Sequence, residues 1–536
     1  MFNVRSRPLS SVFALLALVL TVGCGASTSS SGGGGSGAAA PTGPSGELNV
    51  ALHTFNAETW DPSQTLPFMT QLGGPVFESL FVYSPPNGEL RPMLLDKAEM
   101  APDARSWTLK IKDGIRFSNG DPMTAEDVKF SLDRYRSDAS KTSQAAAFQR
   151  TIQDVQVVDK LTVRVALKEP WLTMNFFLGA LTGNEGIVLP KKYIEQVGWP
   201  AMEKTPIGSG PYKVSNQVIG DSVTFQAVAD HWRAIPRFNQ VKYLSVPEER
   251  TRVALLRSGQ ADLVARLSAD SKKELERDGF KSLIVPNGSQ ESVRFFGAYG
   301  SYAANPLQKL EVRRALTYGI NKQAILDNLY GGLGEVAQYL LSFPGFTTGA
   351  PKGLQATPYD LDQAKRLLQQ AGHPDGFSLT LFVPSSCPAG RTLAEAVAGA
   401  WEKIGVKAQV RPIEFPVFRP YYAGKEHAKE AVGNAYVWCQ AGSPLGLRDL
   451  QNAYWSKGIV KESDVADAEI ERAATATTNE ELVRYTEAAF KKLYDSYAGI
   501  PIANIGLIWM ANQKAADIPT VPTWESFGVW LARDKK

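Results

Sequence analysis

The chain has 536 residues, of which 44% are hydrophobic and 21% are charged, a balance typical of globular proteins. This length exceeds the roughly 250–300 residues at which chains usually divide into domains. Lys and Arg number 57 against 54 for Asp and Glu, so the net charge of +3 excludes a strong positive field for nucleic acid or an anionic bilayer. We therefore expect several domains and no nucleic-acid partner.

The N-terminus carries the features of an export signal. Two arginines precede an apolar segment, residues 12–20, that is too short to span a bilayer. Cys24 then follows, and the leader resembles a bacterial lipoprotein signal, although Thr21 stands where that signal usually has Leu. The resemblance implies that residues 1–23 are removed and that Cys24 is lipidated. A plain secretory peptide and an uncleaved anchor are the alternatives.

Residues 24–46 are rich in Gly, Ser and Ala and lack the apolar residues that would offset the cost of ordering them. We expect a flexible tether that holds the folded part near the membrane, outside the cytoplasm, in the periplasm or at the cell surface. Cys387 and Cys439 are the two remaining cysteines. An oxidising compartment permits a disulfide, but the sequence leaves open whether these two residues approach each other.

Strand and helix patterns alternate along the rest of the chain. Residues 48–52 and 107–112 alternate apolar and polar side chains, as half-buried strands do. Helices are predicted to begin at Thr124, Asp360 and Thr478, where a capping residue precedes an amphipathic segment. This mixture predicts α/β domains, with mixed sheets flanked by helices, rather than an all-helical or all-β body.

No motif for catalysis stands out. The four histidines form neither His-x-x-x-His nor His-Glu-x-x-His, so zinc hydrolysis has no support. A Gly-x-Ser-x-Gly elbow for acyl transfer is also missing, and the glycines at 332–337 follow a predicted helix instead of the strand that a dinucleotide site needs. We therefore expect no enzyme activity, no metal and no cofactor.

Six segments, in order along the chain, carry a family resemblance. They are residues 107–128 (WTLKIKDGIRFSNGDPMTAEDV), 206–212 (PIGSGPY), 230–232 (DHW), 257–262 (RSGQAD), 312–322 (VRRALTYGINK) and 359–368 (YDLDQAKRLL). The chain resembles the extracellular solute-binding proteins of family 5, the oligopeptide-, dipeptide- and nickel-binding components of ABC importers. The match runs from about residue 47 to about residue 504. Within it, Gly208 and Gly210 are expected to permit turn dihedrals.

The resemblance implies a two-lobed, periplasmic-binding-protein-like clam of class II, the three-domain oligopeptide-binding type. The predicted domains are a discontinuous domain I (47–80, 204–285 and 510–536), an inserted domain II (81–203) and domain III (286–509), which forms the opposite lobe. A monomer of this kind would close around a small organic or peptide-like solute and then dock on a membrane permease with its ATPase subunits. An extracytoplasmic hydrolase or envelope sensor that reuses the fold is the alternative.

Ligand contacts in this family cluster at the edges of both lobes. The segment after the first strand offers His53, Thr54 and Phe55, for which an ordinary surface loop is the alternative. In the third domain the resemblance implies contacts from Trp438 and Gln440, at the end of a predicted strand.

One departure from the family pattern bears on the ligand. Ala441 aligns with the Asp that captures the α-amine in peptide binders. Because an ammonium enclosed in a dry site needs a nearby opposite charge, this departure argues against a free peptide. A modified or N-blocked peptide, an oligosaccharide or another polar metabolite fits better.

Three further residues complete the predicted site. Arg391 lies where peptide-binding relatives offer a carboxylate-binding arginine, and a solvated surface arginine is the alternative. Asn184 and Glu185 lie in a Gly-flanked loop that could reach the ligand.

Overall fold

The computed structural model describes residues 44–536 except residues 56–57, 66–71, 85–88, 143, 180–182, 342, 344–345, 388, 423–427, 459, 461, 521–531 and 535–536. The predicted leader, its Cys24 and nearly all of the predicted tether lie outside the described residues. No helix in the described part of the chain is long and apolar enough to cross a bilayer.

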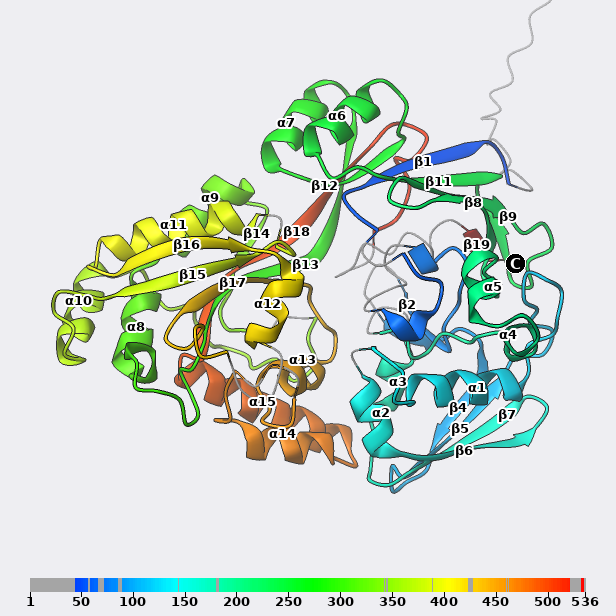
Figure 1. Ribbon diagram of the computed structural model, residues 1–536, viewed down its shortest axis with the longest axis horizontal. Coiled ribbons are helices and arrows are strands. Elements are labelled where there is room, and N and C mark those ends of the chain that lie inside the picture. Colours follow the sequence, from blue (N-terminus) through cyan, green and yellow to red (C-terminus); the bar gives the residue numbers. More distant parts are fainter. Residues whose placement is uncertain are drawn as a thin grey trace, which may run out of the picture. The chain divides into compact units, whose positions relative to one another are not determined.

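Strands occur along the whole described chain, from residue 47 to residue 534 (Figure 1). The strands are β1 (Glu47–Leu52), β2 (Phe81–Ser84), β3 (Glu89–Pro92), β4 (Leu95–Met100), β5 (Ser106–Ile111), β6 (Ile152–Asp159), β7 (Thr162–Leu167), β8 (Tyr212–Val218), β9 (Ser222–Ala227), β10 (Ala234–Pro236), β11 (Gln240–Ser245), β12 (Leu263–Leu267), β13 (Lys281–Phe295), β14 (Gly334–Val336), β15 (Ser378–Pro384), β16 (Lys407–Ile413), β17 (Ala435–Gln440), β18 (Gly499–Ala511) and β19 (Ala532–Asp534).

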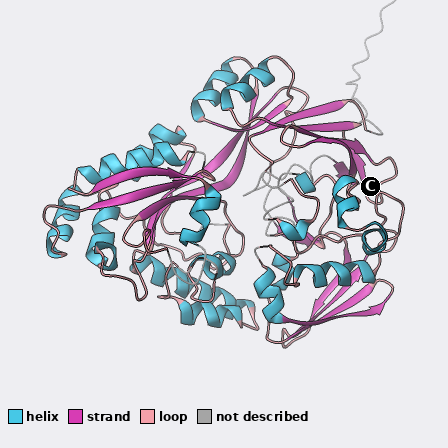
Figure 2. Cartoon of the chain, in the orientation of Figure 1, coloured by secondary structure: helices cyan, strands magenta, loops and turns pink. Residues whose placement is uncertain are grey.

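Helices alternate with these strands, as Figure 2 shows by colour. The helices are α1 (Ala125–Tyr135), α2 (Ala145–Thr151), α3 (Met174–Phe177), α4 (Lys191–Val197), α5 (Trp199–Lys204), α6 (Glu249–Arg257), α7 (Ala269–Arg277), α8 (Leu310–Tyr318), α9 (Lys322–Tyr330), α10 (Leu361–Gln370), α11 (Gly390–Glu402), α12 (Phe415–Tyr422), α13 (Gly446–Ala453), α14 (Asp467–Ala474) and α15 (Asn479–Asp495), with short 3₁₀ turns at Pro62–Gln64 and Pro306–Gln308.

An 11-stranded mixed sheet organises most of these elements. Its strand order is β16-β15-β17-β13-β18-β12-β1-β11-β9-β8, and β14 also pairs with β18. A separate four-stranded sheet, β4-β5-β7-β6, forms within residues 95–167. The mixed α/β class expected from the sequence is therefore confirmed, whereas the three domain boundaries remain a prediction.

Helix starts follow the capping chemistry of the sequence. At α1, the Asp127 carboxylate accepts hydrogen bonds from the backbone N–H groups of Thr124 (2.7 Å) and Lys191 (2.9 Å). At α10 the Asp360 side chain accepts from the N–H of Gln363, and α15 begins in the same way at Thr478. Each side chain satisfies an amide that the first turn of a helix leaves without a partner. The three predicted helix starts are confirmed.

The two faces of the large sheet carry different residues. Side chains of β13 and β17 that lie opposite each other in this antiparallel pair point to the same face. The face that carries Trp438 and Gln440 is called the inner face. The face that carries Cys439 is called the outer face. Helices α9 and α11 pack on the outer face, since their apolar residues share a core with Val437.

Gly208 and Gly210 have a different role from the one expected. Neither has a positive φ, so neither is required for a left-handed turn. A Cβ on Gly208 would instead lie 2.1 Å from the carbonyl oxygen of Val76, and a Cβ on Gly210 would lie 2.5 Å from that of Pro75. The glycines allow two backbone segments to touch, and the N–H of Gly210 donates to the Val76 carbonyl at 2.7 Å.

Replacement of Gly208 by Ala is expected to destabilise the protein by about 1–3 kcal/mol, because the contact is with backbone that cannot swing aside. The urea-unfolding midpoint measures this loss. Gly399→Ala is the matched control: the same methyl group, added at an exposed α11 position with no atom within 4 Å, should leave stability unchanged or raise it by up to about 1 kcal/mol. Equal midpoints for the two variants would contradict the packing account.

Candidate ligand-binding site

The carboxyl ends of β1 and β17 point toward one stretch of the sheet. β1 runs parallel to β12, which is antiparallel to β18. β13 is antiparallel to both β18 and β17, so β17 runs opposite to β1. Both strands therefore end facing the middle of the β13–β18 pair, where the register shifts between Val285 and Ser289. The structure thus directs the two predicted binding segments toward each other.

The three predicted ligand-binding residues after β1 differ in burial. His53 and Thr54 are half-buried, whereas Phe55 is 3% exposed and packs in the main apolar core with residues such as Trp60. His53 and Thr54 thus present polar groups at the end of β1, and Phe55 anchors the turn behind them.

At the end of β17, Trp438 and Gln440 lie on the inner face, on the same side of the strand as Tyr436. All three alternate with Val437 and Cys439, as the period of two in a strand requires. Tyr436 is buried, and Trp438 and Gln440 are half-buried. The ring of Trp438 stacks on Phe418 of α12, with centroids 6.4 Å apart. Trp438 therefore has a fixed orientation.

A buried ion pair lies under these two residues. Arg294 donates through Nη1 to Glu462 Oε1 at 2.9 Å, and the two side chains are 3% and 1% exposed. Arg294 also donates through Nη2 to Gln440 Oε1 at 2.8 Å, and Trp438 Nε1 donates to the same oxygen at 3.2 Å. The hydroxyl of Tyr436 donates to Glu462 as well. This network sets the orientation of the Gln440 amide.

The charges of the pair stabilise each other. Burial opposes the charged guanidinium, but the carboxylate of Glu462 holds the pKa of Arg294 above its ordinary value. Burial, and then the charge of Glu462, raise the pKa of Tyr436, so its hydroxyl stays protonated. Both donors reach Oε1 of Glu462, and the positive charge of Arg294 offsets the negative charge of this carboxylate.

Asn184 and Glu185 do not belong to the network around Trp438 and Gln440. Asn184 is 2% exposed and donates through Nδ2 to the carbonyls of Pro62 and Thr65, both at 2.9 Å. Glu185 is fully buried and accepts from the N–H of Gln144 at 3.0 Å. These bonds attach the loop to neighbouring backbone.

Arg391 lies in the first turn of α11, which covers the outer face. Its side chain is 74% exposed and pairs with Glu395 at 2.9 Å on the same helix. The structure therefore brings Trp438 and Gln440 together but separates Arg391 from them by the sheet.

The sequence reading missed Arg294 and Glu462. A signal existed for Arg294, because a charged residue interrupts the apolar run at residues 293–296. Glu462 lies 168 residues further on, and nothing in its local sequence indicates the pairing.

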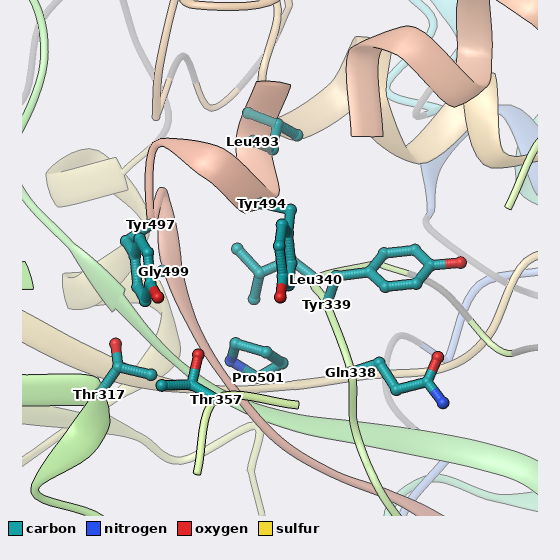
Figure 3. A pocket seen from close by; sticks show the side chains of 10 residues that line it. All are labelled: Thr317, Gln338, Tyr339, Leu340, Thr357, Leu493, Tyr494, Tyr497, Gly499 and Pro501. Atoms are coloured by element: carbon teal, nitrogen blue, oxygen red, sulfur yellow. The ribbon is translucent and has the colours of Figure 1, made fainter. Parts of the chain in front are cut away.

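A small cavity lined by residues between Thr317 and Pro501 is too small to hold a solute. Its lining is shown in Figure 3 and consists of Thr317, Gln338, Tyr339, Leu340, Thr357, Leu493, Tyr494, Tyr497, Gly499 and Pro501. The volume is about 20 Å³, which is room for one water. The Trp438 face remains the better candidate.

Comparisons with known proteins give relatives along most of the chain. The glutathione-binding protein GsiB of Shigella flexneri is 24% identical over 358 residues, which cover 66% of this chain and 67% of the relative. The heme-binding protein A of Haemophilus influenzae is 25% identical over 463 residues, covering 80% and 81%.

A solved structure agrees in fold. The periplasmic binding protein DppA from Helicobacter pylori, in complex with the peptide STSA, superposes with a TM-score of 0.76 at 19% identity, covering 92% of this chain and 99% of that chain. The two-lobed α/β fold expected from the sequence is thereby confirmed. Residues 89–441, about two thirds of the chain, match the family described as bacterial extracellular solute-binding proteins, family 5 middle. The chain belongs to the family 5 bacterial extracellular solute-binding proteins.

Proposed function

We propose that this protein is a lipid-anchored, monomeric receptor that captures a small polar organic solute and delivers it unchanged to an ABC permease with its ATPase subunits. The observation that carries the proposal is the convergence of the β1 and β17 ends on the middle of the β13–β18 pair. His53, Thr54, Trp438 and Gln440 are the residues that would meet the solute. Occupancy would favour the closed arrangement of the two lobes, because the ligand contacts both only when they meet.

The polar network narrows the class of solute. Trp438 offers an aromatic face and Gln440 a fixed amide, while Glu462 is engaged by Arg294 and Tyr436. Arg294 offsets the charge of Glu462, and Ala441 supplies no carboxylate for an ammonium group. A solute with amide or hydroxyl groups and one flat or apolar side fits this surface, such as an N-blocked peptide, an oligosaccharide or another polar metabolite.

Trp438→Ala is expected to abolish the rise in melting temperature that a bound solute causes by mass action. Screening the mature protein against peptides, N-acetyl peptides and oligosaccharides by thermal shift identifies the solute. Tyr359→Ala is the control, because it removes an aromatic ring at a 42%-exposed position outside the predicted site. This variant should keep the rise in melting temperature. A shift that survives Trp438→Ala would remove this residue from the site.

Ala441→Asp should create affinity for a free amine. We expect binding of trialanine to strengthen by at least about tenfold, because a carboxylate would now face the ammonium. N-acetyl-trialanine lacks that charge and should gain nothing; calorimetry compares the two. Ala304→Asp, at an exposed position, controls for the added charge. Equal gains for both peptides would disprove the account of Ala441.

Cys24→Ser should move the protein from the membrane fraction to the soluble extracytoplasmic fraction, because a serine cannot carry the thioether-linked lipid. Fractionation and intact mass measurement detect the change. Thr21→Leu restores the usual signal residue and should keep the protein in the membrane fraction. Membrane retention of the Cys24→Ser protein would show an uncleaved leader instead of a lipid anchor.

A further inference from the structure

The outer face of the sheet contains a hollow of about 490 Å³ at the shifted stretch of β13. We call it the hinge pocket, and define it by Arg266, Ser289, Glu291, Tyr330, Cys439 and Leu507 among its lining residues. One wall comes from the segment joining β12 to α7, and the other from the ends of α9 and β17. The sheet separates the pocket from Trp438, so it is distinct from the solute site proposed above.

Glu291 is the central polar group of the pocket. It is 2% exposed, and its Oε1 accepts a hydrogen bond from Ser289 Oγ at 2.8 Å. Oε2 lies 2.7 Å from Cys439 Sγ and 3.9 Å from Cys387 Sγ.

The two cysteines form a disulfide, with Cα atoms 5.4 Å apart, which settles the pairing that the sequence left open. A disulfide sulfur carries no hydrogen, so neither sulfur can donate to Glu291. Within the described residues, Oε2 has no N–H or O–H donor.

The hydroxyl of Tyr330 is a second group without a partner. Tyr330 is 8% exposed, and its oxygen makes no hydrogen bond with any described residue. Burial, and then the charge of Glu291, raise the pKa of this phenol. The phenol and the carboxylate therefore act on each other electrostatically and line one pocket. Buried acceptors of this kind are normally satisfied.

The charges of the lining favour a cation. Glu249, Asp270 and Glu291 line the pocket against one base, Arg266. Glu249 is engaged by the hydroxyl groups of Ser268 and Ser271, at 2.7 and 2.5 Å. Asp270 is exposed, so Glu291 is the buried carboxylate left for a ligand.

A metal ion is a poor occupant. Glu291, Cys387 and Cys439 lie within 4.8 Å of one another, but the disulfide leaves only the carboxylate as a strong ligand. Apolar lining residues, among them Leu333 and Leu507, suit a hydrocarbon body instead.

We propose that the hinge pocket binds a small organic ammonium ion, whose N–H groups donate to Glu291 Oε2 and Tyr330 Oη and whose apolar part contacts the leucines. The site is separate from the transported solute and does not depend on the identity of that solute.

Phenethylammonium chloride is the probe, and 3-phenylpropionate is its matched anion. Calorimetry on the oxidised mature protein should show saturable binding of the ammonium and none of the carboxylate. Glu291→Gln should weaken the binding by at least about tenfold, and Tyr330→Phe, which removes one oxygen, by a few-fold. Glu480→Gln removes an exposed charge on α15 and should change nothing. Melting temperatures of the variants report whether each is folded.

The pH dependence gives a second readout. Burial raises the pKa of Glu291 to about 7, against the opposing effects of Ser289 and Arg266. The carboxylate is ionised above that pH, so binding at pH 6 should be about tenfold weaker than at pH 8. Tyr330 faces Glu291 from α9, and Glu249 and Asp270 lie in the α6–α7 wall. The probe stays protonated throughout this range.

Three outcomes would overturn the proposal: equal affinity of the ammonium for Glu291→Gln and the unmodified protein, equal binding of the anion, or no change between pH 6 and pH 8. A crystal soaked with the probe supplies the direct check. Density beside Glu291 supports the site, and density only at Trp438 refutes it.

Discussion

The pairing of β13 with β18 is the constraint on which the rest of the structure depends. These strands of 15 and 13 residues hold the centre of the large sheet, with β17 and β12 on their two sides. Their ladder is regular from Lys281 to Val285 and shifts register before Ser289. Gly288 lies in the shifted stretch, where an added Cβ would be 2.4 Å from Leu507 Cγ. A second register shift follows between Glu291 and Ser292, so the ladder is interrupted near its centre.

The pleat of the strands determines on which face of the sheet each side chain lies. Opposite partners share a face, so Arg294 and Tyr436 lie on the inner face, where Arg294 also reaches Gln440. Glu291 and Cys439 lie opposite each other on the outer face. On the inner face, Arg294 and Glu462 are buried together as an ion pair, and Tyr436 also donates to the carboxylate. On the outer face, a carboxylate is buried beside a disulfide that cannot donate to it. The same strands thus present a neutral, preorganised surface on one side and an acidic one on the other.

Local chemistry explains how much of this could be predicted. The half-buried alternation at 107–112 and the caps at Thr124 and Asp360 depend on residues a few positions apart, so the sequence displays them directly. The sequence also predicted that Trp438 lies at the end of a strand, and the structure places it in β17.

Contacts over long separations could not be predicted. The role of Gly208 depends on backbone at Val76, 132 positions away, and Glu291 reaches Cys439 across 148 positions. Such pairs follow from the strand order of the sheet. A motif read along the chain identifies the glycine or the cysteine, but not the atoms that surround it.

The back-to-back arrangement has a thermodynamic consequence for the two proposed sites. The walls of the hinge pocket come from both sides of the shifted stretch, with Arg266 on one and Tyr330 on the other. The ends of β1 and β17 belong to the same two sides. Rotation of one segment of the ladder against the other therefore changes both sites at once, on opposite faces. If an ammonium holds the outer walls in one arrangement, it changes the affinity for solute, and solute changes the affinity for the ammonium by the same factor.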